Sequence, residues 1–229
     1  MKTLYIERSC GGGRDGHWTE ELDLEGVERI VVGTGPGSFA GIRAALAFAQ
    51  GFALGRHCEV LGLPSPCAVA AQILGSVPSS VGSVPDGRLA PSAQDKEGRT
   101  APSAQDKGRL AVVGDARRGK IWIALFDGYS LIRDVFQVNS DEILGSVPTV
   151  EVEKLKGGKV EKGEAIPDDC LIVTVDEARI GEKLKAAFGE RYLGGQTPTA
   201  EGLRAFAEAN PGALVREPLP IYLNPAVRD

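Results

Sequence analysis

Short apolar runs, bounded by glycine, proline or charged residues, recur along this chain and predict β-strands. Such runs are typical of strands that are buried on one or both faces. They lie at 4–6, 27–32, 59–63, 110–113, 120–126 and 171–175. A turn is predicted at 115–119, so we expect the runs at 110–113 and 120–126 to form a hairpin.

Segments whose apolar residues recur every three or four positions predict helices between these strands. They lie at 42–54, 67–74, 178–188 and 199–209. The tripeptide Asn210-Pro211-Gly212 would end the last of them. Strands that partly alternate with helices indicate an α/β layer architecture.

Residues 75–109 interrupt this pattern. The heptapeptide APSAQDK occurs at 90–96 and again at 101–107, and the segment holds no aromatic residue and no isoleucine. A segment with so little apolar side chain to bury does not build a core of its own. We therefore predict a shortened N-terminal α/β lobe at 1–74, a low-complexity insert or linker at 75–109, and a C-terminal α/β lobe at 110–229.

Charge and cysteine content narrow the function classes. The 229 residues include 26 Lys and Arg against 31 Asp and Glu, a formal net charge of −5, which does not favour direct binding to a nucleic-acid backbone. The four cysteines form no CxxC motif and there are two histidines, so we expect reduced thiols in a cytoplasmic protein. No apolar run approaches the ~20 residues of a membrane span, and we expect no membrane contact. The inventory suggests no catalytic residue and no metal ligand.

The strongest local signal is a glycine-rich loop between a strand and a helix. Residues 31–43 read VVGTGPGSFAGIR. Such a loop directs backbone N–H groups and the positive end of the helix dipole toward one point, where they can hold an anion. Gly35, Gly37 and Ser38 are weak candidates for an anion site, because the loop has neither a Walker A lysine nor a complete GxGxxG pattern. The alternative is that the glycines only permit a tight turn and a closely packed helix.

The helix predicted at 42–54 is apolar on almost every side. One stripe suits a core and consists of Ile42, Ala45, Leu46, Ala49, Phe52 and Ala53. The opposite side carries mostly small residues, which allow a second helix to approach closely. Its candidates for a partner interface are Ala44, Ala47, Phe48 and Gly51. The alternative is that both sides are covered within the chain.

Three stretches resemble the signatures of the TsaB (YeaZ) family. Residues 35–43, GPGSFAGIR, and 47–55, AFAQGFALG, resemble its GPGSFTGIR…AxGLALG motif. Residues 115–122, DARRGKIW, resemble its DARxGEVY hairpin, and 220–224, PIYLN, resemble its C-terminal PxYLR. The motif residues are Phe39, Arg43, Asp115, Arg117, Gly119 and Tyr222.

This resemblance implies an actin-like, ribonuclease-H-like α/β fold of two small lobes. It also implies a noncatalytic subunit of the bacterial complex that makes N6-threonylcarbamoyladenosine (t6A37) in tRNA. The implied partners are a TsaD-like catalytic subunit and a TsaE-like ATPase, with a homodimer as a further option and tRNA contacted only indirectly. No cofactor is expected on this chain itself, whereas ATP and metal are expected on the partner subunits.

The chain departs from the family in its first strand and in its length. Residues 6–9, IERS, stand where the family has IDTS, and only the residues from 10 to 34 separate this strand from Gly35, where the family has two more strands and a long helix. Two other functions stay open. One is an actin-like ATP-binding phosphotransferase or ATPase that uses the loop from Gly33 to Ser38, and the other is a decayed copy without function. The sequence offers neither the metal ligands nor the catalytic triad that a peptidase would need.

Overall fold

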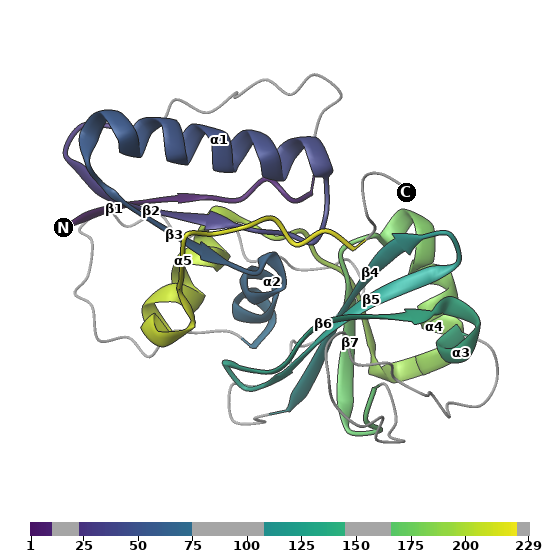
Figure 1. The fold of residues 1–229 in the computed structure, drawn as a ribbon. Coiled ribbons are helices and arrows are strands. Elements are labelled where there is room, and N and C mark those ends of the chain that lie inside the picture. Colours follow the sequence, from purple (N-terminus) through teal and green to yellow (C-terminus); the bar gives the residue numbers. More distant parts are fainter. Residues whose placement is uncertain (11–22, 75–107, 145–165, 224–229) are drawn as a thin grey trace, which may run out of the picture.

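The computed structural model describes residues 1–10, 23–74, 108–144 and 166–223, which form two β-sheets with helices against their faces (Figure 1). The predicted insert at 75–109 lies almost wholly outside the described residues and stays a prediction. Within the described ranges, no helix is both long enough and apolar enough to cross a membrane.

The first sheet has the strand order β1-β2-β3-β9. Its strands are β1 (Lys2–Ile6), β2 (Val27–Gly33), β3 (Glu59–Leu63) and β9 (Val215–Arg216). The first three are parallel, and β9 runs antiparallel to β3.

Helices cover both faces of this sheet, and the side chains of β2 alternate between them. Ile30 and Val32 pack with α1 (Phe39–Arg56) on one face. Val31 packs on the other face, in a core that includes residues of α2 (Ser65–Leu74) and α5 (Ala200–Ala209). A strand that is buried on both faces appears in the sequence as a continuous apolar run, as the predicted strand at 27–32 does.

The second sheet has the order β6-β5-β4-β7-β8. Its strands are β4 (Arg109–Arg117), β5 (Lys120–Asp127), β6 (Ser130–Asn139), β7 (Cys170–Thr174) and β8 (Tyr192–Gly195). The strands β4, β5 and β6 form an antiparallel meander, and β7 and β8 extend the sheet in parallel from β4. One face packs on α3 (Ser140–Leu144), the π-helical turn Glu177–Gly181 and α4 (Glu182–Phe188).

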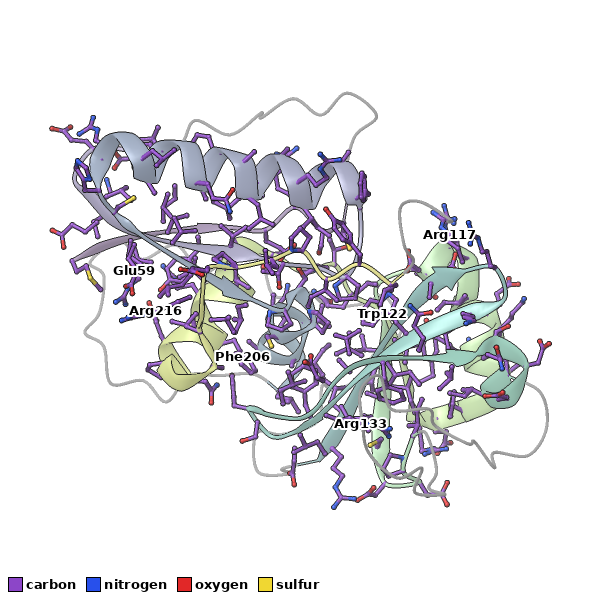
Figure 2. All side chains as sticks on the ribbon, viewed as in Figure 1. Glu59, Arg117, Trp122, Arg133, Phe206 and Arg216 are labelled. Atoms are coloured by element: carbon purple, nitrogen blue, oxygen red, sulfur yellow. The ribbon has the colours of Figure 1, made fainter. Side chains whose placement is uncertain are left out.

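The other face of the second sheet shares a core with the first lobe. Trp122 and Phe126 of β5 belong to the same buried cluster as Val31 and the helices α2 and α5. The ring of Phe126 meets the ring of Phe206 edge-to-face, with centroids 6.0 Å apart. Trp122 lies where the two sheets meet (Figure 2), so the lobes are joined by a common apolar layer.

The segment after β8 returns to the first sheet. α5 packs against α2 and β1, and β9 pairs with β3. The sequence grouped these residues with the C-terminal lobe at 110–229, whereas the structure places them on the N-terminal sheet. The physical reason is that the apolar stripe of α5, with Leu203 and Phe206 buried, covers a sheet face that α2 alone does not.

All the predicted strands and helices are present with small shifts at their ends, but the turn predicted at 115–119 is wrong in its first half. The strand β4 continues to Arg117, which pairs with Lys120. The turn itself consists of Arg118 and Gly119, whose φ angles are 54° and 72°. Two residues with positive φ match the twist of a two-residue hairpin. The sequence did not predict β6, β8, β9 or α3.

Candidate functional site

A cleft of about 770 Å³ lies between the two lobes. The first lobe lines it with Ser9, just after β1, and Ser38, just before α1. The second lobe lines it with Asp115 and Arg117 of the β4–β5 hairpin, and the C-terminal segment adds Tyr222. The three sequence motifs that resemble the TsaB family therefore meet at one cleft, although they are far apart along the chain.

Three glycines near this cleft face the segment that follows β1. A Cβ atom built on Gly33, Gly37 or Gly41 would overlap atoms of residues 7–9. At Gly33 the overlap is with the carboxyl group of Glu7, whereas at the other two glycines it is with the backbone. The absence of side chains at these positions lets the segment lie directly against the loop, which is the structural alternative raised by the sequence.

Most of the candidate anion-binding N–H groups already have acceptors within the protein. The Ser38 N–H donates to the Ser9 carbonyl oxygen at 2.5 Å. The Gly35 N–H donates to Ser65 Oγ at 3.0 Å. Of the three candidates, Gly37 alone has an N–H group for which the described residues provide no such acceptor. The loop is therefore poorly prepared to bind an anion through its backbone.

An acidic side chain is buried beneath the glycine loop. Glu7 Oε1 accepts a hydrogen bond from the Ser9 N–H at 2.7 Å. Glu7 Oε2 and the Ser9 hydroxyl are buried without a hydrogen-bond partner among the described residues. Burial raises the pKa of Glu7, and the hydrogen bond from the Ser9 N–H lowers it by less. Glu7 stands where the family has aspartate, yet it does not line the cleft.

The opposite wall of the cleft is charged. The Asp115 carboxylate accepts from the Arg117 N–H at 2.8 Å and pairs with the Arg179 guanidinium at 3.2 Å. Asp176 accepts from the Asp115 N–H at 2.8 Å. Burial is the main cause that raises the pKa of Asp176, and the charge of Asp115 raises it further. The Arg117 and Arg179 side chains are 60% and 47% exposed, so both present positive charge at the cleft.

Residues from two separate motifs form an aromatic corner beside the cleft. The rings of Phe39 and Tyr222 lie with centroids 5.2 Å apart, and the Arg43 guanidinium lies 4.9 Å from the Phe39 ring centre. Phe39 and Tyr222 are each 47% exposed. The packing of Tyr222 on the first residue of α1 gives a physical role to the C-terminal motif.

The predicted partner face of α1 is largely exposed. Ala44, Ala47 and Gly51 face solvent. Phe48 differs from them, because it is half-buried, packs with the core beneath α1 and stacks on Phe52 at a centroid distance of 6.1 Å. The predicted core stripe is buried at Ile42, Ala45, Leu46 and Ala49 and half-buried at Phe52 and Ala53. The side of the helix with the larger apolar residues is therefore mostly buried, and the side with small residues is mostly exposed.

Sequence reasoning missed several residues of the cleft and its surroundings. Ser65 and Arg179 carry no motif that distinguishes them, whereas Ser9 ends the stretch at 6–9 that was compared with IDTS but was not named as a site residue. Asp176 does carry a weak signal, since it follows the apolar run 171–175 directly and the ends of strands commonly meet at one edge of a sheet. The described residues contain no group of three or more His, Cys, Asp or Glu side chains arranged to hold a metal ion.

The chain resembles known proteins in part of its sequence and in its fold. Residues 19–92 match the family model described as TsaD, tRNA N6-adenosine threonylcarbamoyltransferase. No curated protein matches the chain. Among solved structures, YeaZ from Pseudomonas aeruginosa superposes with a TM-score of 0.50 and 18% identity over 86% of this chain and 74% of that one. An uncharacterized Pseudomonas aeruginosa protein described as similar to peptidase YEAZ gives a TM-score of 0.49 and 20% identity, with the same coverage.

The chain has the α/β fold of YeaZ, which confirms the actin-like, ribonuclease-H-like architecture expected from the sequence. The TsaD family model matches residues 19–92, and the likeness to YeaZ, at 18% identity, is a likeness of fold.

Proposed function

We propose that this chain is a TsaB-type subunit in the synthesis of t6A and that it binds a TsaD-like catalytic subunit through α1. The sequence motifs, the match to the TsaD family model and the YeaZ fold support the general role. The observation that carries the proposed partner contact is the exposed, small-residue face of α1 at Ala44, Ala47 and Gly51.

The chemistry of this face suits helix packing. Ile42, Leu46 and Ala49 hold the opposite side of α1 against the first sheet. On the exposed side, alanine and glycine present no long side chain, so a partner helix can approach to the 8–10 Å between axes that close packing requires. Leu54, which is 82% exposed, extends the apolar surface toward the end of the helix, and exposed apolar patches commonly mark interaction sites.

A noncatalytic role is part of the same proposal. The Glu7 carboxyl group lies beneath the glycine loop, and the N–H groups of Gly35 and Ser38 are bonded within the protein. ATP and metal would then act on a TsaD-like subunit and a TsaE-like ATPase in the cytoplasm. The net charge of −5 suits a subunit that contacts tRNA only through its partners.

Paired substitutions on the two sides of α1 test this proposal. Ala47→Arg places a long charged side chain on the exposed face, so we expect loss of binding to the TsaD protein of the same organism and a stability change within about 0.5 kcal/mol. Leu46→Arg, one residue away, buries a charge in the core and should unfold the domain. The measurements are a pull-down with TsaD and a melting temperature for each variant. Retained TsaD binding by a folded Ala47→Arg variant would show that the partner uses another surface.

One observation favours a second candidate, an actin-like ATP-binding enzyme. The cleft of about 770 Å³ is large enough for a small ligand and is bordered by the cations Arg117 and Arg179. Calorimetry of the isolated chain with Mg-ATP tests it. Micromolar binding, about −8 kcal/mol, together with hydrolysis, would favour the enzyme. A folded chain that binds neither ATP nor TsaD would instead indicate a decayed copy.

A further inference from the structure

The C-terminal residues Val215–Leu223, here called the strap, cross from the first lobe to the second along the cleft. The strap begins as β9 in the first sheet, where Gly62 pairs with Val215. Farther along, the Ile221 N–H donates to the Thr34 carbonyl oxygen at 2.8 Å. At its far end, the Leu223 carbonyl oxygen accepts from the side-chain amide of Gln137 in β6. The strap therefore bonds to both lobes.

The attachment to the first lobe is extensive. Pro218 is buried, and a Cβ on Gly62 would overlap it. Thr34, which receives the Ile221 N–H, is itself 5% exposed and donates its own N–H to the Leu63 carbonyl oxygen at 2.9 Å. This part of the strap is continuous with the first sheet and should separate from it only when the sheet does.

The attachment at the far end is slighter. Leu223 is half-buried against the shared core, and Tyr222 is 47% exposed on the Phe39 ring. Tyr222 and Leu223 both line the cleft. Movement of these two residues would widen the cleft while the rest of the strap, including Ile221, stayed in the sheet. Segments with few buried apolar contacts are the ones that open locally without global unfolding.

We propose that the end of the strap, residues 222–223, is a latch that controls access to the cleft between the lobes. In the closed position, Tyr222 rests on Phe39 and Leu223 is held by Gln137. Release of the two contacts opens the cleft. Release also removes a neighbour from the first turn of α1, because Phe39 is the first residue of that helix and Arg43 stacks on its ring. The latch thereby couples the cleft to the helix, and this inference does not depend on the proposed partner.

Cys10 provides a probe of the closed and open positions. It lines the cleft and is half-buried. Burial, with the nearby charges of Glu7 and Asp176, raises the pKa of the Cys10 thiol to about 12. Because the thiolate is the reactive form, alkylation of Cys10 should be slow while the cleft is closed. Cys58 is also half-buried but does not line the cleft, so it reports on general loosening of the first lobe.

The experiment is alkylation of the full chain with iodoacetamide, followed over time by mass spectrometry of each cysteine-containing peptide. Tyr222→Ala and Gln137→Ala each remove one contact of the latch, so we expect Cys10 labelling about fivefold faster or more, the factor that corresponds to a loss of about 1 kcal/mol. Cys58 labelling should be unchanged. Leu219→Ala is the matched control, because Leu219 lies on the strap but is 77% exposed, and it should leave Cys10 labelling unchanged.

Unchanged Cys10 labelling in folded Tyr222→Ala and Gln137→Ala would overturn the proposal, and so would an equal rise at Cys58. Hydrogen exchange on the unsubstituted protein gives a test that needs no variant. The latch predicts that the amides of 222 and 223 exchange before those of Ile221, β2 and β3. Exchange of all these segments at one common rate would mean that the strap opens only with global unfolding, and the latch would be rejected.

Discussion

The two walls of the cleft are built in contrasting ways. On the first lobe, Gly33, Gly37 and Gly41 lie against residues 7–9, and the polar groups beneath them are buried. On the second lobe, Asp115 holds exposed arginines in place through their side chains. The first wall depends on close backbone contact and the second on charge.

This difference determines how each wall responds to change. A close backbone contact leaves no room, so one added methyl group must displace the chain. An exposed ion pair is worth little, because water and salt screen it and the side chains lose freedom when they pair. Substitutions on the first wall should therefore alter folding, whereas those on the second should leave the fold intact. Single substitutions on each wall test this contrast.

The largest effect is expected at Gly41, near the start of α1. An alanine Cβ there would overlap the Arg8 carbonyl oxygen, so Gly41→Ala should lower the free energy of unfolding by about 1–3 kcal/mol through overpacking. Gly55 lies near the end of the same helix with no other atom within 4 Å of an added Cβ. Gly55→Ala should raise the free energy of unfolding by about 0.5–1 kcal/mol, since alanine is the better helix former.

Urea unfolding of both variants measures this difference in sign. Equal stabilisation by the two alanines would mean that residues 7–9 do not lie against α1. The contrast between the walls would then be lost, because an added methyl group would have as much room on the first wall as on an exposed helix surface.

A smaller, pH-dependent effect is expected at Glu7. Its pKa in the folded state is raised by burial, above the ordinary value of about 4.3 for an unfolded chain. The folded state therefore keeps a proton that the unfolded state has lost, and stability declines as the pH rises from about 4.3 to the folded pKa. Above the folded pKa the loss is complete and constant. Glu7→Gln removes this decline, so the variant should gain stability relative to the original protein as the pH rises.

Unfolding free energies of both proteins between pH 4 and pH 8 (about the range in which the raised carboxyl titrates) check this prediction. Part of the pH dependence should remain in Glu7→Gln, because the pKa of Asp176 is also raised by burial. Parallel curves for the two proteins would show that Glu7 is not buried in the folded state.

Sequence patterns predicted the layers of the fold because burial on one or both faces dictates apolar periodicity. The apolar run at 27–32 predicted a buried strand, and β2 is buried on both faces. The apolar stripe of α1 predicted a side that packs on a core, and that side packs on the first sheet. The edge strand β6 escaped prediction because its side chains are mostly exposed or half-buried, and the pattern is weak there. The position of α5 on the first sheet was not predictable, since an apolar stripe shows that a helix is covered and not which sheet covers it.

The candidate site was predictable in its parts but not in its assembly. The motifs that contain Phe39, Arg117 and Tyr222 were each visible, but their meeting at one cleft depends on how the two lobes pack. The anion-site candidates Gly35 and Ser38 depended on N–H groups whose acceptors, Ser65 and Ser9, lie outside the loop. No local pattern could show that these donors were already bonded.

The smallest effect is expected on the charged wall, at Arg179. Its guanidinium pairs with Asp115 at 3.2 Å, and its side chain is 47% exposed, so Arg179→Ala should lower the free energy of unfolding by at most about 1 kcal/mol. Because the Debye length falls from about 10 Å at 0.1 M salt to about 3 Å at 1 M, this loss should shrink as salt is added. Gly41→Ala should cost the same at both salt concentrations, since overpacking has no charge to screen. The measurement is the unfolding free energy of both variants at low and high salt. A large, salt-independent loss at Arg179 would mean that the second wall is held by packing as the first is, and the two walls would no longer differ in kind.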